Sequence, residues 1–168
     1  MARISYADPD RLQPHLRTWF DILPPDPRLF LAFARAEGTA GLVMDLAFAL
    51  HRALKLPERL VELVATTVTR VEESEYLRQR HIPRAGLLTD AERDAILQGT
   101  DAPTFDDRDH AVLRLSEAIS AGPRVGEATY AAAREHLSDR ELVELIQVHA
   151  YYWMAARTAT VLDIDADA

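Results

Sequence analysis

Apolar residues recur at helical spacing along most of the chain. One segment, 57–71, carries apolar side chains over a wide surface, at Leu60, Val61, Leu63, Val64, Val68 and Val71. Its valines and threonines would also suit a strand, but its length and the proline at its start favour a helix. The last segment, 139–164, is apolar on most sides. Such a helix is typical of a core or a subunit interface.

Start and stop signals divide the rest of the chain into further helices. Thr89 with Glu92, and Ser138 with Glu141, have the spacing of a capping box at a helix N-terminus. Ser74 is positioned to cap a helix reaching residue 81. The other predicted helices cover 16–23, 27–36 with Gly38 as its stop, 42–54, 107–121 and 126–136.

The pattern as a whole predicts an all-α fold. No glycine-rich phosphate loop, strand-turn-helix unit or low-complexity segment occurs. A length of 168 residues fits one domain with a substantial core. We expect residues 1–25, which are rich in proline, to form an irregular arm with a short helix. Residues 26–165 are expected to form a single helical domain.

Composition narrows the classes of partner and compartment. The formal net charge of -8 argues against nucleic-acid binding, which needs clustered basic residues. Lys55 is the only lysine among 19 basic residues, so arginines would hold any anionic substrate. No apolar run approaches the ~20 residues of a membrane span, and the N-terminus lacks a signal pattern. We therefore expect a cytoplasmic protein that binds neither nucleic acid nor membrane.

A carboxylate stands in the middle of the apolar segment 57–71. Glu62 is followed twelve positions later by Ser74, then by Glu75 and Tyr76, and His81 lies seven positions after Ser74. If the chain folds back after residue 73, Glu62 and His81 meet, and the carboxylate would then orient the imidazole for proton transfer. An isolated buried carboxylate is costly, so Glu62 needs a partner.

The alternative is a structural role for both groups. Glu62 would then pair with Arg59 or Arg70, and His81 would lie on the surface. His51, His149 and Trp153 stand on apolar segments, where packing is their more common role.

The segment LPERLVELVATTVTRVEESEYLRQRHIP, residues 56–83, resembles the core motif of the carboxymuconolactone decarboxylase and alkylhydroperoxidase D superfamily. The flanking blocks PRLFLAFARAEG, FDDRDHAVLRLSEAI and HLSDRELVELIQVHAYYWMAARTATVLDID extend the resemblance over about residues 20–165. The resemblance implies an alkylhydroperoxidase D-like helical bundle. It also implies a homo-oligomer, which would be a trimer or hexamer and could be built from dimers.

The peroxidase members of this superfamily carry a glutamate, a C-x-x-C pair that begins twelve positions later, and a histidine seven after the first cysteine. Glu62 and His81 match the glutamate and the histidine, whereas Ser74 and Leu77 replace the cysteines and Tyr76 stands between them. The chain has no cysteine at all. Serine cannot cycle through sulfenic acid and disulfide. The peroxiredoxin activity that the superfamily name suggests is therefore expected to be absent.

The decarboxylase members act through acid-base residues on a small anionic lactone, and the residues kept here are compatible with such chemistry on a small anionic, lactone or aromatic substrate. We expect a cofactor-free lyase or isomerase in which His81, oriented by Glu62, is the general acid or base. Glu75 and Tyr76 would donate further protons or orient the substrate. The expected substrate-binding residues are Ser74, Arg70, Arg157 and Tyr152.

Metal and cofactor sites are not expected. A di-iron bundle would need paired Glu-x-x-His motifs, which are missing, and thiolate ligands are excluded by composition. The rival hypothesis is a non-catalytic oligomer that keeps the fold and binds a small molecule or a protein. The loss of both motif cysteines favours this rival, and the retained ionisable pair favours the enzyme.

Overall fold

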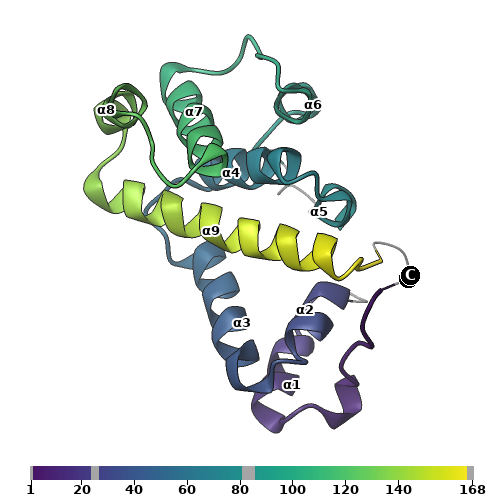
Figure 1. Ribbon diagram of the computed structural model, residues 1–168. Coiled ribbons are helices and arrows are strands. Elements are labelled where there is room, and N and C mark those ends of the chain that lie inside the picture. The colour runs from purple at the N-terminus through teal and green to yellow at the C-terminus, as the bar shows by residue number, and fades with distance from the viewer. Residues whose placement is uncertain (1, 24–26, 81–85, 166–168) are drawn as a thin grey trace.

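The computed structural model describes residues 2–23, 27–80 and 86–165 and shows an all-α protein (Figure 1). This confirms the predicted fold class. In the described residues the elements are η1 (Pro9–Arg11), α1 (Pro14–Phe20), α2 (Arg28–Phe33), α3 (Glu37–Arg52), α4 (Glu58–Val71), α5 (Glu75–Arg80), α6 (Asp90–Gln98), α7 (Asp107–Ala121), α8 (Glu127–His136) and α9 (Asp139–Val161).

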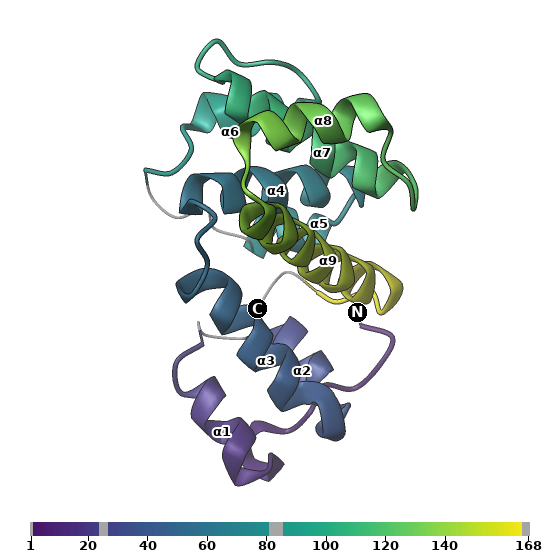
Figure 2. The same ribbon diagram turned by 90° about the vertical axis from the view of Figure 1, so that its left-hand side faces the viewer.

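The helices form three tiers, which both ribbon views show (Figures 1 and 2). Helices α4, α5 and α9 occupy the middle tier, α6, α7 and α8 lie on one side of it, and α1, α2 and α3 lie on the other. The long helix α9 crosses the molecule between the two outer groups. The middle tier thus supplies most of the buried surface on which a site can be built.

Helix α4 is the centre of the core, with every residue from Leu60 to Thr69 buried. Its threonines are compatible with burial because Thr67 and Thr69 donate their hydroxyls to the carbonyls of Leu63 and Ala65, each at 2.8 Å. A threonine hydroxyl that bonds back to the preceding turn is satisfied within its own helix. The helical prediction for this valine- and threonine-rich segment is therefore confirmed.

Local capping signals predict the start of α6 and α9 correctly. Both capping boxes form, at Thr89 with Glu92 and at Ser138 with Glu141. Gly99 ends α6 with φ at 68°, in the left-handed region that glycine adopts at little cost.

The prediction that Gly38 ends a helix is wrong. Helix α2 already ends at Phe33, and Gly38 is the second residue of α3, which begins at Glu37. The N–H groups in the first helical turn have no partner within the helix, so a glycine is tolerated there.

Both ends of the described chain meet beside α9. The N–H of Arg3 donates to the carbonyl of Leu162 at 2.8 Å, and Asp165 lies 3.5 Å from the guanidinium of Arg28. A smaller apolar cluster, separate from the main core, forms around Leu16 and Met44 on α1 and α3. None of the described helices combines the length and apolarity needed to cross a membrane.

Candidate functional site

Glu62 is buried in the middle of α4, with 2% of its surface exposed. It lines a hollow of about 60 Å³ together with His51, Arg52 and Glu58, and with the apolar residues Leu50, Leu54, Leu56 and Val61. We call this the α3–α4 hollow. A volume of this size holds a few water molecules, or one polar group of a ligand, since a water needs roughly 10–15 Å³. Two carboxylates, an imidazole and a guanidinium therefore surround one small space.

His51 is the functional candidate that sequence reasoning missed. It lies in the last turn of α3, half-buried, and its ring meets that of Tyr152 edge-on at 6.4 Å. Tyr152, buried on α9, meets Tyr151 edge-on at 5.5 Å. The short connection between α3 and α4 is the sequence signal that could have placed His51 near the start of α4. A tight reversal at residues 53–57 sets the end of one helix beside the start of the next.

The predicted partner of Glu62 lies outside the described residues, because His81 follows α5 directly. The Glu62–His81 pair therefore stays a prediction. The arginines that were the alternative partners are directed to other carboxylates. Arg59 contacts Asp109 and Glu92, and Arg70 contacts Glu117.

A hydroxyl on the same face of α4 has no partner in the described residues. Thr66 stands one turn after Glu62, and its Oγ1 is buried without a hydrogen bond there. Thr67 and Thr69, in contrast, bond back to their own helix. Thr66 and Glu62 thus form a polar stripe along a buried face of α4.

Ser74 acts as a helix cap, as its sequence position predicted. It is fully buried, and its Oγ accepts a hydrogen bond from the N–H of Leu77 at 3.4 Å at the start of α5. Its own N–H donates to the carbonyl of Thr69 at 3.1 Å. The hydroxyl therefore holds the turn between α4 and α5.

Glu75 and Tyr76 point to different surroundings. Glu75 is exposed, accepts a hydrogen bond from Gln79 at 2.6 Å and lies 3.5 Å from Arg78. The hydroxyl of Tyr76 accepts a hydrogen bond from the N–H of Leu29 at 3.2 Å, which ties α5 to α2.

Burial, and to a smaller extent the neighbouring Tyr76, raises the pKa of Tyr151, so that this phenol stays protonated.

The two arginines predicted to hold a substrate are engaged elsewhere. Arg70 pairs with Glu117 on α7 and lines a different hollow. Arg157 is exposed, pairs with Glu72 and lies over the ring of Trp153, 5.8 Å from its centroid. The arginine that lines the α3–α4 hollow is instead Arg52, whose guanidinium lies 5.2 Å from the ring centroid of Phe48.

His149 is a buried histidine whose contacts join two helices. Its Nε2 lies 2.9 Å from the hydroxyl of Ser120, and burial lowers its pKa, with a hydrogen bond to the backbone of Ser116 opposing the shift. It joins α9 to α7 away from the α3–α4 hollow. In the part of the chain that the structure describes, no three acidic or histidine side chains gather as a metal site.

The buried neutral His149 predicts a pH dependence of stability. The unfolded chain takes up a proton near the ordinary histidine pKa of ~6.5, whereas the folded protein does so only at lower pH. The free energy of unfolding should therefore fall as pH drops below ~6.5, by at most about 1.4 kcal/mol per pH unit from this group. Urea unfolding between pH 5 and 8 measures it. His149→Gln should flatten the slope and His15→Gln, at an exposed site, should not; equal slopes in all three proteins would contradict the assignment.

Sequence comparisons give no match, either to known protein families or to curated proteins. Comparison with solved structures does find similar proteins. A peroxidase-related protein from Silicibacter sp. TM1040 is 16% identical, with a TM-score of 0.78 over 99% of this chain and 92% of that one. A cysteine-to-alanine variant of the debrominase Bmp8, solved with 2,3,4-tribromopyrrole, is 15% identical, with a TM-score of 0.78 over 99% and 91%.

A third similar structure is a protein of unknown function from Agrobacterium tumefaciens, provisionally assigned as the antioxidant defence protein AhpD. It is 18% identical, with a TM-score of 0.68 over 81% of this chain and 96% of that one. The chain has the alkylhydroperoxidase D-like fold, and the predicted resemblance is confirmed at the level of the fold. At sequence identities this low, similarity to solved structures establishes the fold alone.

Proposed function

We propose that the protein is a cofactor-free acid-base enzyme of the lyase or isomerase type, acting on a small anionic lactone or aromatic substrate. The observation that carries the proposal is the buried carboxylate of Glu62, which opens onto a hollow shared with His51 and Glu58. Carboxylates and an imidazole around one secluded space are the groups that general acid-base catalysis uses. In this proposal Glu62 orients an imidazole, either His81 or His51, which moves the proton.

The remaining lining of the hollow supports an anionic substrate. Arg52 supplies a fixed positive charge there, and a guanidinium binds a carboxylate through two parallel hydrogen bonds. The hollow itself admits one polar group, so the rest of the substrate would lie outside it. The similar debrominase structure holds 2,3,4-tribromopyrrole, a small planar ring, which supports a substrate of this size.

A cysteine-dependent peroxidase is not supported, although two of the similar structures carry peroxidase or antioxidant names. The chain has no cysteine, and Ser74 caps α5 where the motif would place the first thiol. A hydroxyl cannot take the thiol's place in a redox cycle.

Turnover of a substrate panel tests the proposal. The purified protein is incubated with γ-carboxymuconolactone, other carboxylated lactones and small aromatic acids. Carbon dioxide release reports decarboxylation, and NMR of the products reports isomerisation. We expect turnover of one substrate class, its loss in either His51→Gln or His81→Gln, and its retention in His149→Gln, a buried histidine outside the hollow. Retention of full turnover in His51→Gln would exclude His51 from the chemistry, and no turnover across the panel would favour the alternative.

The alternative is a non-catalytic module that keeps the fold and binds a small molecule. The replacement of both motif cysteines by Ser74 and Leu77 favours this alternative. The two hypotheses differ in one measurable respect, because a binding module would retain a panel compound without converting it.

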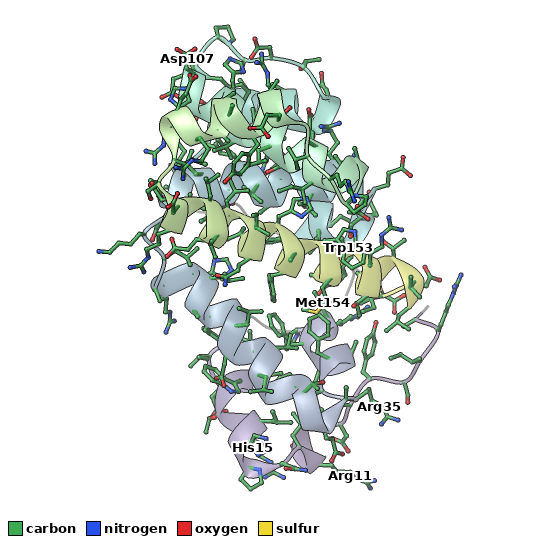
Figure 3. All side chains as sticks on the ribbon, turned by 60° about the vertical axis from the view of Figure 1, so that its left-hand side comes forward. Arg11, His15, Arg35, Asp107, Trp153 and Met154 are labelled. Atoms are coloured by element: carbon green, nitrogen blue, oxygen red, sulfur yellow. The ribbon has the colours of Figure 1, made fainter. Side chains whose placement is uncertain are left out.

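We also propose that the protein is a homo-oligomer that associates through α9. Four large apolar side chains on this helix are exposed, at Val143, Ile146, Trp153 and Val161, with 55%, 48%, 45% and 58% of their surfaces accessible. Their spacings of three, seven and eight positions place them on one stripe. Figure 3 labels Trp153 and its neighbour Met154. Of the two, Met154 points from α9 towards α2 and α3. An exposed apolar stripe of this kind supports a protein contact.

A charge on the stripe should dissociate the oligomer. Ile146→Asp places a carboxylate in the proposed interface, where it would be buried without a partner. We expect light scattering to give an oligomer for the natural protein and a smaller species for the variant. Ile22→Asp, at an equally exposed apolar position beyond α1, is the control and should leave the mass unchanged. A natural protein that is already monomeric would contradict the proposal.

A further inference from the structure

A second hollow, of about 250 Å³, lies between α4, α6 and α7. We call it the α6–α7 hollow. Its charged and titratable lining consists of Arg70, Asp101, His110, Arg114 and Glu117. It shares no lining residue with the α3–α4 hollow, so any ligand it takes is independent of the proposed reaction.

The acidic side chains of this hollow are already engaged. Glu117 pairs with the guanidinium of Arg70. Asp101 accepts a hydrogen bond from the N–H of Ala102 at 2.8 Å and lies 3.6 Å from Nε2 of His110. Each acidic side chain thus has a basic neighbour that offsets its negative charge.

Hydrogen-bond donors, in contrast, remain available. Arg114 is exposed on α7 and makes no ion pair or hydrogen bond within the described part of the chain, so its guanidinium is open to a ligand. A guanidinium carries five N–H donors and no acceptor, so it is satisfied only by an acceptor. A carboxylate matches this fork with two parallel bonds.

The other walls of the hollow are apolar and close. Ile96, Leu113 and Phe105 line it, and Gly99 lies against the Arg70 side chain at ordinary contact distance, since a Cβ there would be 3.4 Å from Nη1. A volume of about 250 Å³ is below the roughly 300–1,000 Å³ of sites for drug-sized ligands. The ligand is thus small and has an apolar body.

We propose that the α6–α7 hollow binds a small carboxylic acid with an aromatic or branched aliphatic body. Arg114 binds its carboxylate, and the ring or alkyl group lies against Ile96 and Phe105. A neighbouring hollow of about 480 Å³ between α7 and α8 is also lined by Arg114. It fits the ligand less well, because Asp107 and Glu135 add negative charge and its apolar lining is limited to alanines.

Titration of the ¹⁵N-labelled protein with benzoate tests the proposal by amide chemical shifts. We expect saturable shifts at the amides of Gly99 and Thr100, and smaller or no shifts with benzamide, the neutral analogue. Arg114→Gln should weaken benzoate binding about tenfold or more, because it removes a charge-assisted bond. Arg124→Gln removes the same charge from an exposed position outside both hollows and should leave binding unchanged.

Three outcomes would overturn the proposal. These are the absence of saturable shifts with benzoate, equal affinity in the Arg114→Gln protein, and shifts centred on Ala128 and Thr129 of the α7–α8 hollow. The spectra also show whether each variant is folded. Glu62→Gln should not change the titration, so the result is independent of whether the α3–α4 hollow is catalytic.

Discussion

Replacing Glu62 with glutamine is expected to lower kcat by about 10²–10⁴-fold on the substrate that the panel identifies, the range that general acid-base catalysis contributes. Glutamine keeps the size of the side chain and can still form a hydrogen bond, so the fold should be retained. It cannot stabilise a positive charge on a neighbouring imidazole, and the proton transfer therefore loses its driving force. Steady-state kinetics as a function of pH measures both the loss of rate and any loss of pH dependence.

A double-mutant cycle identifies the imidazole that acts with Glu62. If His81 is the partner, His81→Gln and Glu62→Gln combined should cost little more than either alone, because groups that act as a unit are strongly non-additive. The same cycle with His51→Gln would then be additive, and the reverse pattern would assign the role to His51. Glu127→Gln, the same exchange at an exposed site on α8, is the control. Full activity in Glu62→Gln would exclude an acid-base role for this carboxylate.

The features of the fold that sequence predicts best depend on neighbours in the chain. The capping boxes at Thr89 and Ser138 involve residues three apart, and both form where predicted. The cap at Ser74 is equally local. Gly38 shows the limit of such signals, since a glycine is tolerated in the first turn of a helix as well as at its end. Its place inside α3 depends on how α2 and α3 pack.

The candidate site is predicted only in part, because it depends on contacts between tiers. The burial of Glu62 follows from its place in an apolar helix, and the structure confirms it. His51 joins it through the turn between α3 and α4, and the contact of His51 with Tyr152 depends on α9, a hundred residues away in the chain. The spacing of apolar and polar residues does not encode such a meeting, so sequence reasoning treated His51 as packing.

Arg59 is the clearest case of a residue whose role only the structure reveals. Its guanidinium lies 2.8 Å from Glu92 on α6 and 2.6 Å from Asp109 on α7, and it also donates to the carbonyl of Leu87 at 2.9 Å. Both carboxylates are 3% exposed. One arginine on α4 thus joins the middle tier to two helices of the outer tier. The Arg59 guanidinium, above all other contacts, lowers the pKa of Glu92 to about 2.

Arg59→Met should lower the free energy of unfolding by about 3–5 kcal/mol at pH 7, because it leaves two buried carboxylates side by side without a counter-charge. Urea unfolding of both proteins measures the difference. Arg93→Met is the control, since Arg93 pairs with the exposed Asp90 at 3.3 Å and such pairs contribute about 0–1 kcal/mol.

The cost of Arg59→Met should also shrink in acid. The stabilisation that Glu92 gains from its lowered pKa is complete above the ordinary glutamate pKa of ~4.3 and is lost as pH falls towards 2. In Arg59→Met the folded-state pKa of Glu92 rises, so that protonation relieves the uncompensated charge and the variant recovers relative to the natural protein. A difference at pH 3 as large as that at pH 7 would show that Arg59 acts through packing of its side chain and not through the two carboxylates.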